Sequence, residues 1–235
     1  MSDAPSPDTP VTRAAPDDDG FARALRGFGP TGLAAVLVIL LANGVFVSLN
    51  GALVLLWAWR SRTPWRALGF VRPASWPRTI ALGVVFGAAF KLAMKALVMP
   101  MLGADPINRT YHFLAGNPGA APGMLYALIA GAGFGEETVF RGFLFERLGR
   151  RIGTSRAAAL ATVAGTALLF AAMHLPDQGL PGAEQAVFTG LAFGAIYART
   201  RALPLLMIAH AAFDLAAYAL IYWSLETRVA HWVFR

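Results

Sequence analysis

The residues of this sequence best suited to chemistry stand inside long apolar stretches, where charged groups are rare. They are Glu136, Glu137, His174, His210 and Asp214. A charged side chain within a membrane helix costs about 2.5–3.5 kcal/mol on insertion scales, so such residues usually face a bundle interior or a wet cavity. A carboxylate flanked by two neutral imidazoles can deprotonate a bound water for attack on an amide carbonyl. These residue types therefore indicate hydrolysis within the membrane.

Sequence spacing places two pairs of ionisable residues on shared helical faces. Glu137 and Arg141 are four residues apart with the acid on the N-terminal side, the favourable order for an ion pair. Glu136 points about 100° away around the same helix and has no charged partner in its own run. His210 and Asp214 are also four residues apart. Two imidazoles and a carboxylate from three separate helices can thus converge on one point, as in sites built within helix bundles.

Two chemistries are open for this constellation. Glu136 can act as the base itself, or it can join His174 and His210 in holding Zn²⁺ with a water in the fourth position. The chain has no cysteine, which excludes thiolate nucleophiles and cysteine-based zinc sites. Both the zinc ion and the metal-free Glu/His pair remain open at this point.

The elements that must position these residues are membrane helices. Of the 235 residues, 57% are hydrophobic and 14% are charged, and the mean hydropathy is +0.54, which indicates an integral membrane protein. Apolar runs of the length that spans a bilayer occur near 31–58, 79–99, 123–146, 156–175, 183–199 and 202–223. The predicted fold class is all-α, a polytopic transmembrane helix bundle with about six membrane helices.

The chain divides into two predicted parts. Residues 1–28 are rich in Pro, Asp and Ser without apolar periodicity, so we expect a disordered N-terminal tail. Residues 29–235 are expected to form one membrane domain, whose motif-bearing core covers about 123–223. High Ala and Arg usage with little Lys indicates a GC-rich bacterial genome, and therefore a bacterial plasma membrane.

The net charge of +7 reflects membrane topology and not a nucleic-acid surface. The arginines gather in the connections after the first, third and fifth apolar runs: Arg60, Arg62, Arg66, Arg72, Arg78, Arg147, Arg150, Arg151, Arg156, Arg199 and Arg201. The positive-inside rule predicts that these connections are cytoplasmic and that both termini lie outside. Arg23 and Arg26, directly before the first run, oppose this orientation.

Three motifs resemble a known family. The segments EETVFR (136–141), FAAMH (170–174) and HAAFD (210–214) are similar to the ordered motifs EExxxR, FxxxH and HxxxN of the CAAX prenyl protease and bacteriocin-processing (Abi) family of intramembrane proteases. The segment ALGFVRP (67–73) is similar to family members as well. The resemblance implies an endopeptidase that cleaves prenylated, peptide or membrane-protein substrates by Glu/His-activated water, with the lipid bilayer as a partner and no nucleic acid.

The resemblance also implies residue roles. Glu136 is expected to activate water with His174 as its partner, while His210 and Asp214 position the water or stabilise the oxyanion. Glu137 and Arg141 complete the first motif, either in catalysis or as a structural ion pair. If a metal is used, its ligands are Glu136, His174 and His210. Asp214 departs from the family's usual Asn, so it is either protonated or orients His210, because an ionised Asp only accepts hydrogen bonds.

Two other classes of function compete with the protease. A non-catalytic immunity or scaffold protein of the same fold would use the polar cluster for structure only. A proton-coupled transporter also uses buried Glu, His and Asp, but the sequence lacks the internal repeats common in transporters. Lys91 and Lys95 are expected to extend towards the outer interface, the alternative being a role as counter-ions to the carboxylates. The small residues of GAGFG (131–135) are expected to permit close helix packing.

Overall fold

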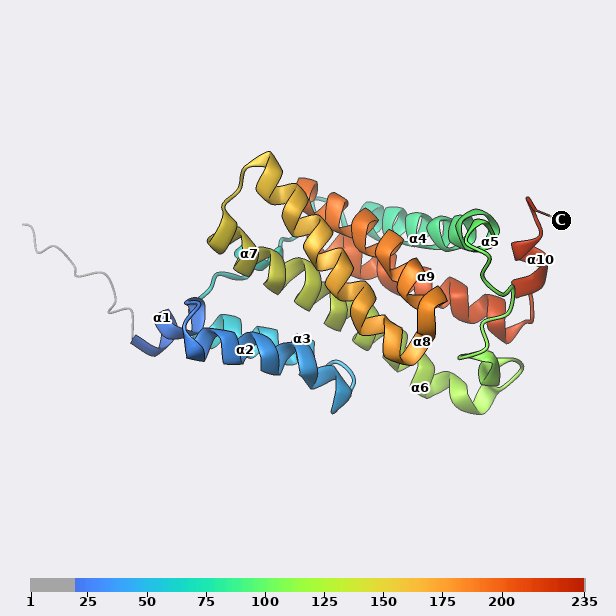
Figure 1. The fold of residues 1–235 in the computed structure, drawn as a ribbon, viewed down its shortest axis with the longest axis horizontal. Coiled ribbons are helices and arrows are strands. Elements are labelled where there is room, and N and C mark those ends of the chain that lie inside the picture. Colours follow the sequence, from blue (N-terminus) through green and yellow to red (C-terminus); the bar gives the residue numbers. More distant parts are fainter. Residues whose placement is uncertain (1–19, 235) are drawn as a thin grey trace, which may run out of the picture.

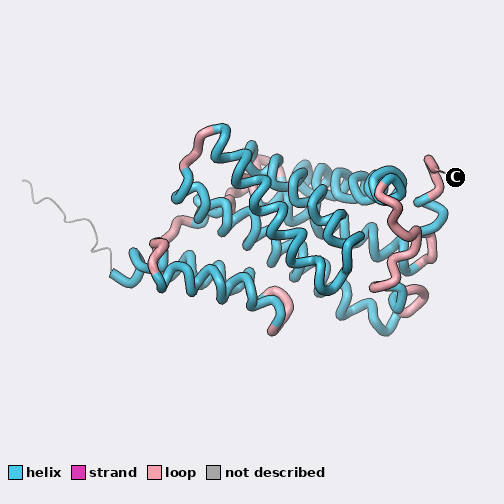
Figure 2. Tube along the Cα trace, in the orientation of Figure 1, coloured by secondary structure: helices cyan, strands magenta, loops and turns pink. Residues whose placement is uncertain are grey.

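The computed structural model describes residues 20–234, which are helical with connecting loops and contain no strand (Figures 1 and 2). This confirms the all-α membrane bundle. The α-helices are α1 (Gly20–Arg26), α2 (Pro30–Leu41), α3 (Leu49–Arg60), α4 (Trp76–Ala93), α5 (Met99–Met101), α6 (Ala121–Tyr126), α7 (Leu144–Ile152), α8 (Arg156–Thr200), α9 (Leu203–Tyr222) and α10 (Glu226–Ala230). Short 3₁₀ turns are η1 (Ala42–Gly44), η2 (Trp65–Leu68), η4 (His112–Leu114) and η5 (Pro118–Ala120), and π-helices are η3 (Met94–Val98), η6 (Ala127–Glu136) and η7 (Thr138–Phe143).

The number of membrane spans is smaller than the predicted six. By length and composition, three helical segments of the described chain are able to cross a membrane: Trp76–Met101, Arg156–Thr200 and Leu203–Tyr222. A fourth is added if the bent pair Gly20–Arg26 and Pro30–Gly44, which meet at 58°, is one span. The difference comes from the first run, which is divided, from the third, which consists of shorter elements, and from the fourth and fifth, which form the single segment Arg156–Thr200.

The first apolar run, 31–58, is a helical hairpin and not one helix. α2 and α3 have 12 residues each, about 18 Å, which is shorter than the roughly 30 Å hydrocarbon core. The chain reverses between them, with Ser48 at a left-handed φ of 71°. The Arg26 guanidinium donates to the carbonyl oxygen of Ser61, and the Trp57 indole donates to that of Leu25 at 3.2 Å. Both ends of the run therefore lie at the same end of the molecule.

This hairpin changes the predicted topology. Arg147 of α7 donates to the carbonyl oxygens of Arg26 and Gly27, so α1 joins the arginine-rich end. The described chain begins at that end and finishes at the opposite one, beside α10 (Figure 1). The expectation of both termini on one side is thus wrong for the described ends. Arg23 and Arg26 now lie at the arginine-rich end, so their charges agree with a cytoplasmic position of that end.

The predicted disordered tail also needs correction at its C-terminal part. Gly20–Arg26 forms α1, and Ala22 and Leu25 on this helix are buried against the bundle. Leu25 belongs to the same apolar cluster as Ile39 and Val54. The rest of the predicted tail, residues 1–19, lies outside the described part of the chain.

The third run is longer than expected and varies in helical type. Helical backbone continues without a break from Ala121 to Ile152 through α6, η6, η7 and α7. The π-helical pieces η6 and η7 flank Glu137, and such pieces often occur at functional sites. Because this segment consists of shorter elements, it is not among the three spans counted above.

The fourth and fifth runs are the two arms of α8. Gly179 has φ 64° and ψ −168°, a conformation that breaks the helix. The arms fold back on each other, since a Cβ built on Gly190 would lie 2.8 Å from the Cα of Ala167. The first arm extends past residue 175, which places His174 inside the helix and not at its end.

Small residues bring the central helix α9 against both neighbours. A Cβ on Gly87 of α4 would lie 2.0 Å from the carbonyl oxygen of Ala209, and one on Gly133 of η6 would lie 3.0 Å from that of Met207. The expectation that GAGFG permits close packing is therefore confirmed. These contacts fix α9 on either side of His210.

Candidate active site

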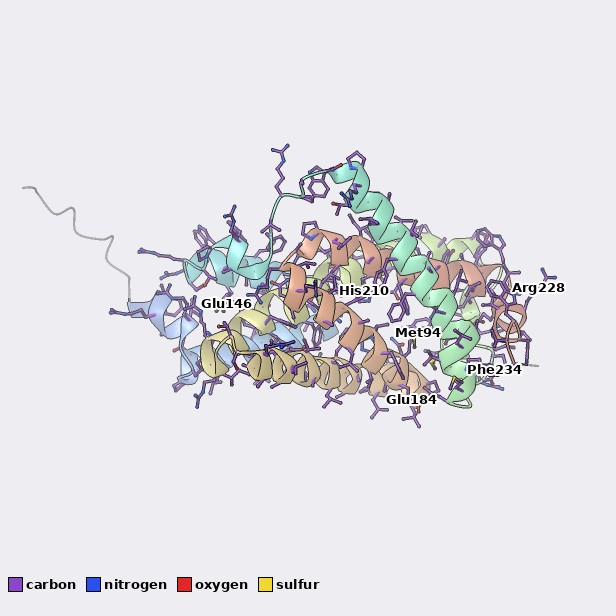
Figure 3. The ribbon with its side chains drawn as sticks, turned by 90° about the horizontal axis from the view of Figure 1, so that it is seen from above. Met94, Glu146, Glu184, His210, Arg228 and Phe234 are labelled. Atoms are coloured by element: carbon purple, nitrogen blue, oxygen red, sulfur yellow. The ribbon has the colours of Figure 1, made fainter. Side chains whose placement is uncertain are left out.

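Residues from η6, both arms of α8 and α9 surround a cavity of about 360 Å³. The sequence-predicted residues Glu136, His174, His210 and Asp214 all line it. Figure 3 shows His210 on α9, within the bundle. The structure thus brings together four of the six predicted site residues around one space, although they are up to 78 positions apart in the sequence.

Glu137 and Arg141 lie behind this cavity and do not line it. The Arg141 guanidinium donates to Glu137 Oε1 at 2.8 Å, and both side chains are almost fully buried. Arg141 also stacks over the ring of Phe170, 4.9 Å from its centroid. The predicted i, i+4 ion pair is confirmed.

The same carboxylate oxygen also holds His210. Nδ1 of His210 lies 2.7 Å from Glu137 Oε1, so Nδ1 carries the proton and donates it. This tautomer leaves Nε2 pointing to the cavity side of the ring. Glu137 therefore orients the second histidine, a role that the sequence analysis gave to Asp214 as one of two alternatives.

Two further carboxylates approach Nε2 of His210. Glu136 Oε2 lies 3.8 Å away and Asp214 Oδ2 lies 3.6 Å away, both beyond direct hydrogen-bond distance. Oε2 of Glu136 is buried and has no hydrogen-bond partner among the described residues. The space between these three side chains is thus lined by acceptors and one imidazole nitrogen, an arrangement that suits a water molecule.

His174 faces the cavity from the first arm of α8. Its Nδ1 lies 2.8 Å from the carbonyl oxygen of Phe170, which only accepts, so Nδ1 is the protonated nitrogen. Nε2 is then the acceptor of the neutral ring. Packing against Phe170, with ring centroids 4.4 Å apart, fixes the ring orientation.

Several polar residues of the cavity wall were missed by the sequence reasoning. They are Asn43, Asn50, Asn108, Tyr111, Asp177, Gln178 and Gln185. Asn50 is 3% exposed within the apolar run 31–58, and a polar side chain inside such a run is a signal that could have indicated it. The loop between α5 and η4 contributes Asn108 and Tyr111, which no periodicity could have placed over the site.

Tyr111 is the titratable group of that loop nearest the site. Burial raises the pKa of its hydroxyl, and the nearby carboxylates of Asp214, Glu136 and Asp177 raise it further. The phenol therefore remains protonated at neutral pH and keeps its donor proton.

The two lysines of the second run are not at the interface as expected. Lys91 is 7% exposed and its Nζ donates to Gln185 Oε1 at 2.8 Å. Lys95 Nζ pairs with Glu226 Oε1 at 3.2 Å and donates to the carbonyl oxygen of Pro106. Both ammonium groups are therefore held inside the protein.

The expected metal ligands Glu136, His174 and His210 line the same cavity. In the described chain, no group of three or more His, Asp and Glu side chains is arranged to hold a metal ion. Nδ1 of His210 and Nδ1 of His174 are both engaged with other acceptors. These contacts leave Nε2 of both rings free, as in histidines that bind a metal through one nitrogen and donate the other N–H to an oxygen, so a metal-free route and a metal-assisted one are distinguished by the chelation experiment.

A membrane helix bundle with buried carboxylates and imidazoles around one cavity belongs to the class of proteins that carry a polar site inside the membrane. Residues 118–216 match the family model described as type II CAAX prenyl endopeptidase Rce1-like. This match agrees with the resemblance to CAAX-type proteases that the three motifs gave, and it covers all six predicted site residues. No curated protein and no solved structure matches the chain.

Proposed function

We propose that this protein is an intramembrane endopeptidase of a bacterial plasma membrane, acting on prenylated, peptide or membrane-protein substrates. The observation that supports it best is the placement of Glu136 Oε2, buried and without a hydrogen bond among the described residues, 3.8 Å from Nε2 of His210 at a shared cavity. A buried carboxylate and an imidazole side by side at the wall of a cavity are suited to general-base catalysis on a water bound in that cavity.

In the proposed reaction Glu136 removes a proton from a water in this space. The hydroxide oxygen attacks the scissile carbonyl carbon, and the electron pair of the carbonyl double bond moves to its oxygen. When the tetrahedral species collapses, the C–N bond breaks and the proton held by Glu136 passes to the leaving nitrogen. The glutamate is thus returned to its ionised form, and one water is consumed for each bond cleaved.

His210 is proposed to position the water or the oxyanion through Nε2. Glu137 fixes its tautomer and ring orientation through the 2.7 Å contact at Nδ1. Asp214 lies on the cavity side of the same imidazole and, when protonated, donates a hydrogen bond as an Asn would. His174, with Nε2 as an acceptor, is proposed as the partner of Glu136 in proton transfer.

The test is cleavage of a prenylated peptide that carries a fluorophore and a quencher on either side of the expected bond. The purified wild type in lipid nanodiscs should cleave it, and Glu136→Gln should lower kcat by about 10²–10⁴-fold, the usual contribution of general-base catalysis. Arg228→Gln, far from the site on α10, is a control expected to cleave normally.

The same assay addresses the open choice between a metal and a metal-free route. We propose the metal-free Glu/His pair, so activity should survive dialysis against a strong chelator and should not rise when Zn²⁺ is restored. Loss of activity on chelation with recovery on Zn²⁺ addition would instead assign Glu136, His174 and His210 as ligands. Normal cleavage by Glu136→Gln would favour the non-catalytic scaffold of the same fold.

A further inference from the structure

A buried lysine near the site, Lys91, has no carboxylate within ion-pair distance among the described residues. The charge of Asp214 acts on it only from further away. Lys91 of α4 is 7% exposed, and its Nζ hydrogen bond goes to the neutral amide oxygen of Gln185 at 2.8 Å. The ring of Phe213 lies under the ammonium, 4.9 Å from its centroid. Within the described chain, no carboxylate forms an ion pair with Lys91. Buried charges are usually paired, because taking an ion out of water is costly.

Lys95 provides an internal comparison one helical turn away. Its Nζ pairs with Glu226 Oε1 at 3.2 Å, and Glu226 also accepts from the backbone nitrogen of Asn108 at 3.0 Å. This lysine is neutralised and anchors the loop before η4. Among the described residues, Lys95 thus forms an ion pair with a carboxylate, whereas Lys91 forms a hydrogen bond with a neutral amide.

The position of Lys91 between two cavities indicates which kind of group could pair with its ammonium. Lys91 lines the cavity that contains Glu136 and His210, and also a second, adjoining cavity of about 180 Å³. The residues common to both cavities are Lys91, Asn108, Gln178, Gly182, Gln185, Ala217 and Ile221. Asp214 lines the first cavity too, but its carboxylate is 3.6 Å from His210. Lys91 therefore stands where a ligand extending from the candidate catalytic residues would reach it.

We propose that Lys91 binds a carboxylate of the peptide substrate, with Gln185 orienting the ammonium. An ammonium has three protons, of which Gln185 accepts one, so two remain for an anion. Charge-assisted hydrogen bonds of this kind are strong in a site that excludes water. The carboxylate comes either from the C-terminus of the peptide or from an acidic side chain near the cleaved bond. This inference rests on the proposed function, because it assigns the partner of Lys91 to its substrate.

Binding is measured first, with full-length Glu136→Gln protein in nanodiscs so that no turnover occurs. Two pairs of fluorescent prenylated peptides serve as probes: one pair ends in a carboxylate or a carboxamide, and the other carries Asp or Asn at the penultimate position. We expect the acid member of one pair to bind about tenfold more tightly or better than its neutral partner. The pair that discriminates identifies the source of the carboxylate.

Lys91→Met in the same background should remove this preference by weakening the acid peptide alone, and Lys91→Arg should retain part of it. The control is Arg228→Gln on α10, which removes a cation that lines neither cavity and should keep the preference. Melting temperatures identify any variant that fails to fold, in which case Lys91→Gln replaces Lys91→Met. Equal binding of acid and neutral peptides by the parent protein, or an unchanged preference in the Lys91 variants, would refute the proposal.

Cleavage by the otherwise unchanged protein separates the two proposals. Cleavage of acid and neutral peptides with the same KM refutes the carboxylate site and leaves the endopeptidase standing. A binding preference that depends on Lys91, without any cleavage, supports the carboxylate site and refutes the endopeptidase.

Discussion

Glu137 does not line the cavity, but it holds both Arg141 and His210 of the candidate site in place. Its Oε1 accepts from Arg141 at 2.8 Å and from Nδ1 of His210 at 2.7 Å, so one oxygen joins the first motif to the third. Its Oε2 is buried without a hydrogen bond among the described residues. A single carboxylate thus balances the charge of a buried guanidinium and selects the tautomer of an imidazole.

The two adjacent glutamates should therefore respond differently to the same substitution. Glu136→Gln keeps shape and leaves the Glu137–Arg141 pair intact, so the melting temperature should stay near that of the wild type while turnover falls. Glu137→Gln leaves Arg141 unpaired, which costs about 3–5 kcal/mol for a fully buried pair, and it should lower both stability and kcat. Thermal melting beside peptide cleavage measures both effects.

A double variant tests the cause of the instability. Adding Arg141→Met to Glu137→Gln removes the orphan charge, so part of the lost melting temperature should return. Activity should not return with it, because His210 Nδ1 still lacks its carboxylate acceptor. Recovery of both together would mean that Glu137 acts through the ion pair alone.

The sequence predicted the side-chain pair within one helix but not the contact between distant helices. The Glu137–Arg141 pair follows from a four-residue spacing, because neighbours on one helical face are fixed by helix geometry. The contact between Glu137 and His210 joins residues 73 positions apart. It depends on how two helices are rotated against each other, which no local pattern contains. Lys91 was misplaced for the same reason, since burial by a neighbouring helix overrides the tendency to reach the interface.

At the scale of elements, the contact of α4 with α9 positions the second histidine. Gly87 permits this approach, because a Cβ there would lie 2.0 Å from the carbonyl oxygen of Ala209, the residue before His210. We expect Gly87→Ala to push the helices apart and to lower both melting temperature and activity. Gly123→Ala on α6, where a Cβ would meet nothing within 4 Å, is the matched control and should be neutral. Normal activity of Gly87→Ala would show that the site tolerates movement of α9.

The hairpin of α2 and α3 shows why the first predicted run is not one helix. Hydropathy counts apolar residues, and the run 31–58 is apolar on both sides of its turn, so the turn-forming residues Asn43, Gly44 and Ser48 do not lower its hydropathy enough to divide it. Val45 and Phe46 at this turn are 83% and 61% exposed, as expected for a tip that faces lipid. By contrast, the reversal in α8 contains Pro176, Gly179 and Pro181 and was found as a gap between two predicted helices.

The tip of the hairpin gives a prediction at the same scale. Val45→Asp would place a charge in hydrocarbon if the tip is embedded, so the variant should accumulate poorly in membranes. Val233→Asp, on an exposed apolar residue beyond α10, should have a smaller effect. Equal accumulation of both variants in isolated membranes would indicate that the tip reaches water.

At the scale of the whole molecule, the arginine-rich end contains α1, the α3–α4 connection and α7. The positive-inside rule predicts that this end is cytoplasmic. Because the chain has no cysteine, single cysteines report on exposure without background. Gly20→Cys and Ser75→Cys should both resist an impermeant thiol reagent in intact spheroplasts, and Gly116→Cys should react. Labelling of the first two variants, with protection of the third, would show that the protein has the opposite orientation in the membrane.

The return of the first apolar run to its starting end also bears on biogenesis. In a six-span protein whose N-terminus lies outside, the N-terminal segment would have to be translocated across the bilayer before the first helix could insert. If the arginine-rich end is cytoplasmic, as the positive-inside rule predicts, the contact of Arg26 with Ser61 lets the hairpin enter and leave the membrane on the side of synthesis. The first polar stretch that must be transported is then the loop after α5, near Asp105, which later covers the site. The loop that covers the cavity is thus translocated before the helices that bear Glu136, His174 and His210 are inserted.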